Sequence, residues 1–247
     1  MLSKVAGSRE ACKLVMREHT PARIAFASSF RGLDNTYKGR SMLIFDDLDA
    51  FFRSLMRYIG NGYTDAQISV IPHKKVHKIK HIDVKLRERY KSDLTSGKRQ
   101  YRRKKGLANY AVLRFRDKLY IVLKSPGKDE LDERWKSIYK TPLQLGDILR
   151  LEVIRDERGK NTVKIEKNLL KEIRSSIFLA IEKRDGRRFH SELNKLYNLH
   201  KVLKYRGIAM QLSSLLRDIK IAQKKHGTSW SVPTFFYGTS GKRARTE

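Results

Sequence analysis

The spacing of apolar side chains changes along the chain, and each spacing predicts a different kind of element. Between residues 48 and 59 they recur every three or four positions, which predicts an amphipathic helix ending at Gly60-Asn61-Gly62. Asp46 is placed to cap its first turn. Upstream, the pattern predicts a short helix over 8–19 and strands over 23–30 and 41–45. A further strand is predicted over 67–71.

Two later segments alternate in the manner of β-hairpins. The first covers residues 109–125 and turns at 116–118, and the second runs over 147–154 and returns along 161–166. These four strands predict an antiparallel or mixed four-stranded sheet. A short helix is expected between the hairpins, around residues 129–139.

The pattern becomes helical from residue 168 onward. One apolar stripe spans 169–181, a second helix is predicted over 187–204, and a third over 208–226, with Gly186, Gly207 and Gly227 as breaks. The prediction is an α+β fold with a mixed α/β part over 1–167 and a helical bundle or hairpin over 168–227. A flexible basic tail is expected over 228–247.

Charge adds a class of partner to this picture. The 247 residues carry a formal net charge of +29, and residues 74–118 alone hold seventeen Lys/Arg against four Asp/Glu. Such a stretch repels itself unless a polyanion lies along it, and nucleic acids and acidic membrane surfaces are the common polyanions of a cell. The basic stretch lacks the apolar face of a membrane-surface helix, so we expect nucleic acid and no membrane partner.

Cysteine content and apolar runs bound the location. Cys12 is the single cysteine, which excludes an intramolecular disulfide and a multi-cysteine zinc finger. The apolar runs are far shorter than a bilayer span, and the N-terminus does not resemble a secretory signal. We expect a cytoplasmic protein, with a nucleoid-associated location as an alternative.

The segment 96–105, with sequence SGKRQYRRKK, is the strongest candidate for contact with nucleic acid. In a basic loop here, cations would neutralise successive phosphates while Tyr101 stacks on a base or sugar. A solvated loop is the alternative. The candidate cations are Lys98, Arg99, Arg102, Arg103, Lys104 and Lys105, with Lys74 and Lys75 at the start of the basic stretch.

The first hairpin extends this candidate site. One face is core-like, and the other carries Tyr110, Arg114, Tyr120 and Lys124. We predict that this second face is exposed and adds to the basic loop. Alternatively, the two tyrosines pack under a helix.

A metal site is not predicted. His73, His77 and His81 recur every four residues, but lysines surround them and the H-E-x-x-H spacing is absent. A loose nuclease-like pattern consists of Asp65 and the sequence Asp83-Val84-Lys85, in which an acid and a lysine would lie on one strand. The pattern keeps a metal-dependent nuclease open as an alternative.

The C-terminal helices suggest a second contact. Residues 201–207 followed by the amphipathic stretch 208–225 fit a helix–turn–helix with Gly207 in the turn, in which Arg217 and Lys220 face phosphate. An ordinary helical hairpin is the alternative.

Taken together, the patterns predict a non-enzymatic nucleic-acid-binding protein without a cofactor. DNA is preferred over RNA, because the C-terminal helices suit a groove and no RNA-module motif is present. Replication, transfer or regulation of a mobile element is a plausible setting. Two alternatives stay open: a metal-dependent nuclease or nickase of a mobile element, and a structural RNA-binding component of a ribonucleoprotein. Protein partners are unknown.

Overall fold

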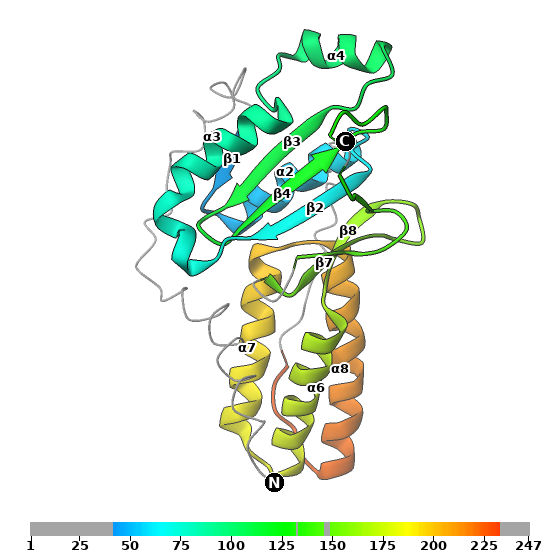
Figure 1. Cartoon of the computed structure of the whole chain (residues 1–247). Helices are drawn as coiled ribbons and strands as arrows, with labels where there is room; N and C mark the ends of the chain where they lie inside the picture. The colour runs from blue at the N-terminus through cyan, green and yellow to red at the C-terminus, as the bar shows by residue number, and fades with distance from the viewer. Residues whose placement is uncertain (1–41, 132, 146–148, 233–247) are drawn as a thin grey trace, which may run out of the picture. The chain divides into compact units, whose positions relative to one another are not determined.

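The computed structural model of the chain describes residues 42–131, 133–145 and 149–232 (Figure 1). The chain divides into two compact units, the first ending at Leu149 and the second beginning at Arg150. The predicted boundary near residue 168 therefore lies inside the second unit. The helix and strand predicted over 8–19 and 23–30 lie outside the described residues.

A five-stranded sheet forms the centre of the first unit. Its strands stand in the order β1 (Met42–Phe45), β3 (Tyr110–Phe115), β4 (Leu119–Lys124), β2 (Asp65–Val70) and β5 (Lys136–Ser137). β1 is parallel to β3, and the other neighbouring strands are antiparallel. The hairpin predicted over 109–125 is confirmed, because β3 and β4 pair with Phe115 opposite Leu119.

The strand set of this sheet differs from the predicted one. The second hairpin consists of β7 (Leu151–Arg155) and β8 (Asn161–Ile165), and both strands belong to a separate sheet of three strands. The remaining short strand is β6 (Leu143–Gln144). The α+β class is confirmed, whereas the single four-stranded sheet is wrong. The first hairpin pairs instead with β1 and β2, which precede it by several dozen residues, and local periodicity carries no signal of such pairing.

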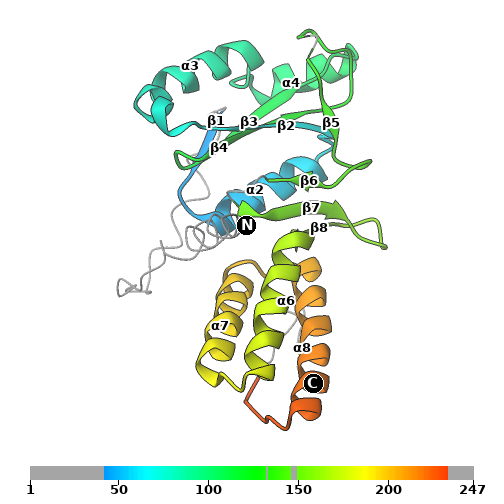
Figure 2. The same cartoon turned by 60° about the horizontal axis from the view of Figure 1, so that its bottom comes forward.

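One face of the five-stranded sheet is covered by α2 (Leu48–Gly60), as Figure 2 shows. The Phe51 ring lies 5.3 Å from the Phe115 ring of β3. The predicted helix is confirmed, but its cap is Asp47 rather than Asp46: the Asp47 carboxylate accepts from the Ala50 N–H at 2.9 Å. The buried residues of the helix are Phe51, Phe52, Leu55 and Ile59.

The opposite face is covered by η1 (His73–Lys78) and α3 (Ile79–Tyr90). Here Val112 of β3 and Val122 of β4 lie in a second core cluster, against which Ile82 and Leu86 of α3 pack. Figure 2 shows α2 and α3 on the two sides of the sheet. The first unit is therefore a three-layered α/β/α arrangement with two cores.

The helix predicted over 129–139 is wrong. Residues 136–137 form β5, which pairs with the first two residues of β2, and no helix is assigned between 133 and 139. Tertiary contacts decide this conformation: Trp135 stacks on Tyr110 with ring centroids 5.8 Å apart, and Asp129 accepts from the Leu131 N–H at 3.0 Å.

In the second unit, the three predicted helices follow the β7–β8 hairpin along the chain. They are α6 (Lys167–Glu182), α7 (Gly186–Val202) and α8 (Arg206–His226), and they run side by side in Figures 1 and 2. The predicted helical bundle is confirmed in this form. Their buried residues include Ile177, Phe189, Leu193 and Leu212.

Two glycines fix close approaches in this unit. A Cβ on Gly207 would come within 2.4 Å of the Val163 carbonyl oxygen, so α8 lies directly on β8. Gly186 lies under Trp230, whose ring also packs on Phe189 at 4.9 Å. Residues 228–232 thus pack on the bundle, although the sequence places the start of a flexible tail at 228; residues 233–247 are outside the described range.

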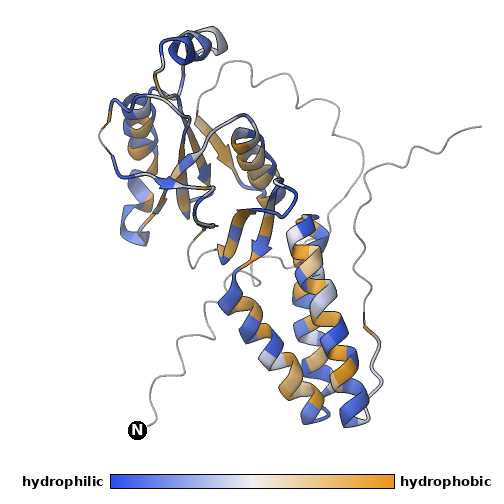
Figure 3. Ribbon diagram, turned by 90° about the vertical axis from the view of Figure 1, so that its right-hand side faces the viewer, coloured by the Kyte–Doolittle hydropathy of each residue, from blue (hydrophilic) through white to orange (hydrophobic). Residues whose placement is uncertain are grey.

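Polarity follows the layers. In Figure 3 apolar residues gather on the strands and on the helix faces that meet them, while the uppermost helix, α4 (Ser96–Lys104), is almost entirely hydrophilic. No helix among the described residues has the length and apolar character needed to cross a membrane.

Candidate nucleic-acid interface

The strongest candidate segment forms a helix, α4, and not the loop that the sequence predicts. Thr95 caps its start by accepting from the Lys98 N–H at 3.4 Å. Gly106 ends the turn after it with φ 69°, a conformation that favours glycine. Figure 1 shows α4 beyond the end of the sheet, joined to the unit at both ends. The helix therefore presents the basic residues in two groups.

The first group holds α4 to the unit. The Arg102 guanidinium donates from Nε and Nη2 to the Ala108 carbonyl at 3.2 and 2.9 Å, and Nη2 also meets Glu130 at 2.8 Å. Arg99 donates to the Ser92 carbonyl at 2.9 Å. The bond from Arg102 lowers the pKa of the Glu130 carboxyl, the largest of several causes. Two of the six predicted phosphate contacts are thus used within the protein.

The second group faces solvent around Tyr101. This tyrosine is 62% exposed, and the Lys105 Nζ lies 5.8 Å from the centre of its ring. Lys98 and Lys104 stand three residues before and after it, which places them on the same side of the helix. Lys98, Arg103, Lys104 and Lys105 are exposed, and none makes an ion pair with a carboxylate in the described part of the chain. Cations without an ion-pair partner can bind phosphates, while the aromatic ring between them stacks on a base.

The basic and aromatic face of the hairpin is not exposed, so that part of the prediction is wrong. Tyr110 and Tyr120 are 5% and 4% exposed and belong to the core cluster under α3. The side chains of Arg114 and Lys124 are 13% and 14% exposed. The alternative, that the tyrosines pack under a helix, describes what the structure shows.

Each of these four side chains has a polar or charged partner inside the protein. Tyr120 donates to Asp83 at 2.7 Å, and Arg114 lies 3.3 Å from the same carboxylate. Burial raises the pKa of Tyr120, and its bond to Asp83 adds to the shift. Lys124 lies 3.6 Å from Asp129, which accepts from Tyr110. Burial, followed by the bond to Asp129, likewise raises the pKa of Tyr110. The arrangement is an internal network that holds α3 and the 129–135 segment to the sheet.

The start of the basic stretch lies on η1 and the outer face of α3. Lys74 and Lys75 are exposed, as the prediction for them requires. His73, His77 and His81 are exposed as well, and no group of three metal-binding side chains occurs among residues that the structure describes. Lys80 and Lys85 continue the exposed cations along α3 toward α4.

The nuclease-like residues do not come together. Asp83 and Lys85 lie on a helix and not on a strand, and Asp83 is already bound to Tyr120 and Arg114. Asp65 pairs with Lys124 of β4, whereas Asp83 accepts from Tyr120 of the same strand. Tyr120 and Lys124 are four residues apart, which is about 13 Å along the strand. The placement of Asp83 and Lys85 on one strand is therefore wrong, and the geometry gives Asp65 and Asp83 no shared metal position.

Arg217 and Lys220 are exposed on α8 in the second unit. A DNA-reading helix–turn–helix crosses its helices at about 90–120°, whereas α7 and α8 run side by side in both views (Figures 1 and 2). Gly207 lies inside the first turn of α8 on β8, and not in the connection. The helical-hairpin alternative describes this pair of helices.

The sequence holds one signal for the helix that covers the hairpin. Ile79, Ile82, Leu86 and Tyr90 follow helical spacing, and their side chains pack on the sheet. Their signal is diluted by the histidines and lysines between them. Comparison of the chain with protein-family models, with curated proteins and with solved structures finds no match.

Proposed function

We propose that this protein binds nucleic acid, with single-stranded or unpaired segments as the preferred form, through the exposed side of α4. The observation that carries the proposal is the setting of Tyr101: 62% exposed, with Lys105 at 5.8 Å and two further lysines on the same side of the helix. Neither the hydrophobic core nor the helix cap requires an aromatic ring at the position of Tyr101. The exposed cations of η1 and α3 extend the same charge.

Binding without catalysis is part of the proposal. The two candidate carboxylates of a metal-dependent nuclease lie on different elements, Asp65 on β2 and Asp83 on α3, and Asp83 is committed to a structural ion pair. We keep DNA ahead of RNA because no RNA-module motif is present in the sequence. The second reason for DNA, a C-terminal helix–turn–helix, does not support it, since the helices lie side by side.

The test is a fluorescence-anisotropy titration of labelled single-stranded DNA, duplex DNA and single-stranded RNA at low salt. The triple variant Lys98→Glu, Lys104→Glu, Lys105→Glu should weaken binding of the single strand at least about tenfold. The matched control is Lys167→Glu, Lys171→Glu, Lys183→Glu, which makes the same charge change on exposed residues of α6 and just after it. Affinity of the wild-type chain no better than micromolar for every probe contradicts the proposal, as does equal weakening by both variants.

A further inference from the structure

The free edge of β2 borders a pocket that the nucleic-acid proposal does not use. β2 has six residues, but β5 pairs only with Asp65 and Ala66. On that side, no described main-chain group bonds to Ile68, Ser69 or Val70. Successive residues of a strand point their N–H and C=O groups to opposite sides, so at least one of Ile68 and Ser69 presents both groups to the open edge.

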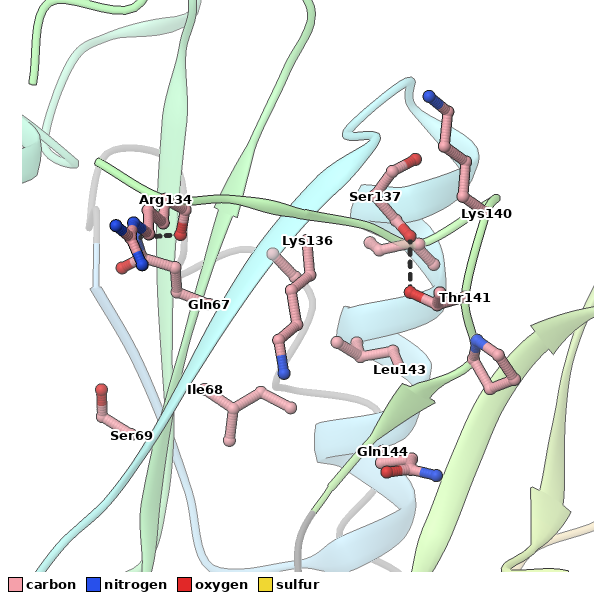
Figure 4. Close-up of a pocket in the computed structure, with 13 residues that line it drawn as sticks. Gln67, Ile68, Ser69, Arg134, Lys136, Ser137, Lys140, Thr141, Leu143 and Gln144 are labelled. Atoms are coloured by element: carbon pink, nitrogen blue, oxygen red, sulfur yellow. Dashed lines mark hydrogen bonds between the residues drawn. The ribbon is translucent and has the colours of Figure 1, made fainter. Parts of the chain in front are cut away.

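The pocket beside this edge has a volume of about 910 Å³. Its walls are β2 on one side and residues 134–144, which run from β5 to β6, on the other. Ile68 and the buried Ile138 and Leu143 supply an apolar floor. Figure 4 shows Lys136 extending between Ile68 and Leu143, with its amine in the pocket. The space therefore combines a strand edge, an apolar surface and a cation.

The described side chains that line the pocket carry charge of one sign. They include Arg134, Lys136 and Lys140, and no acidic residue is among them. Lys136 and Lys140 are exposed, and neither forms an ion pair with any carboxylate that the structure describes. A ligand that fits must bring negative charge to these amines while also satisfying both donors and acceptors of a strand edge.

Elsewhere the chain closes such an edge. The Gln211 amide of α8 accepts from the Ile165 N–H at 2.8 Å and donates to the Ile165 carbonyl at 2.9 Å on the edge strand β8. On β2, the Gln67 side chain donates to the Arg134 carbonyl, and no described side chain bonds to the main chain of Ile68 in the way that Gln211 bonds to Ile165. Natural proteins commonly protect long strand edges, and an unprotected edge is a template for another strand.

We propose that this edge binds an extended acidic peptide segment of a partner protein, which adds as a strand beside Ile68–Val70. The main chain of the peptide pairs with β2, an apolar side chain contacts Ile68, and a carboxylate meets Lys136. A nucleic-acid strand fits the edge less well, because its phosphates offer only acceptors and would face the carbonyl oxygens of β2. The proposal concerns a different surface from α4 and does not depend on nucleic-acid binding.

The experiment selects ligands from a library of linear peptides of about ten residues displayed on phage, with the full chain as bait. We expect enriched peptides to alternate apolar and acidic residues. Synthetic copies should slow amide hydrogen exchange within residues 67–70, and N-methylation at alternate peptide positions should abolish binding while methylation at the intervening positions does not.

The variant Lys136→Glu, Lys140→Glu should weaken the selected peptides at least about tenfold and leave anisotropy titrations with oligonucleotides unchanged. The control Lys104→Glu, Lys105→Glu should have the opposite pair of effects, so that failure of one proposal is separable from failure of the other. The inference is overturned if no acidic peptide is enriched, if the peptides protect amides elsewhere, or if the α4 control releases them. If Lys136→Glu, Lys140→Glu weakens oligonucleotide binding, the edge binds nucleic acid instead.

Discussion

A single aromatic side chain, that of Tyr101, distinguishes base stacking by α4 from binding through charge alone. If Tyr101 stacks on a base, Tyr101→Ala should weaken binding of single-stranded DNA by about tenfold, in line with about 1–3 kcal/mol per stacked base. Tyr101→Phe keeps the ring and should bind as the wild type does. Tyr197→Ala, which removes a tyrosine 41% exposed on α7, is the matched control. Equal loss with Tyr101→Phe and Tyr101→Ala would show that the hydroxyl, and not the ring, makes the contact.

A second residue gives the protein a defined response to acid. His200 is 8% exposed near the end of α7, and burial, followed by the nearby charge of Lys204, lowers its pKa below the ordinary 6.5. The unfolded chain therefore binds a proton more readily than the folded one. The stability that His200 contributes is present above about pH 6.5 and is lost as the pH falls through its folded-state value.

Urea unfolding measured from about pH 7 to about pH 5 should show this loss as a falling free energy of unfolding in the second unit. In His200→Gln the free energy should change less over the same range. His190→Gln, at an exposed position of the same helix, should keep the wild-type slope. An unchanged slope in His200→Gln would mean that other groups carry the acid response.

At the level of elements, the contact of α8 with β8 depends on the absence of a side chain. Gly207→Ala places a Cβ 2.4 Å from a backbone oxygen, so one element must shift, at a cost of about 1–3 kcal/mol. Gly60→Ala, at the end of α2, has nothing within 4 Å and should be neutral or slightly stabilising. Helical ellipticity followed through urea unfolding measures both. Wild-type stability in Gly207→Ala would show that α8 can move off the strand without loss.

Elements with a strong local pattern could be predicted from the sequence, and elements decided by partners could not. The α2 stripe from Phe51 to Ile59 and the alternation of β3 and β4 are local signals, and both elements are confirmed. Alternation does not decide whether Tyr110 and Tyr120 face water or a covering helix. Either environment can supply an acceptor for their hydroxyl groups. Asp83 on α3 supplies such an acceptor. The conformation of residues 129–139 is likewise decided by a tertiary partner. Trp135 packs on Tyr110, and the segment does not form the predicted helix.

For the candidate site, the sequence indicates where the basic cluster lies. It does not indicate which of its residues anchor α4 and which face solvent. Arg99 and Arg102 look identical to their neighbours in the run, yet they bind the carbonyls of Ser92 and Ala108. Only the three-dimensional position of those carbonyls distinguishes an anchoring arginine from a free one. Helical spacing from Tyr101 groups Lys98, Lys104 and Lys105 on one side, but the sequence predicts a loop for this segment.

At the scale of the whole molecule, the question is whether the net charge of +29 acts as a coat or through one surface. Counterion release separates the two, because log K falls with log salt by about 0.7 per phosphate neutralised on a single strand. Lys98→Ala, Lys104→Ala, Lys105→Ala should therefore reduce the slope by about 2 if all three lysines contact phosphate. The comparison variant, Arg217→Ala, Lys220→Ala, Lys224→Ala, removes the same charge from exposed residues of α8 and should leave the slope nearly unchanged. Anisotropy titrations at several salt concentrations measure both slopes. If the slopes fall equally, the phosphates are neutralised by both units, and the basic residues of the bundle belong to the interface as fully as those of α4.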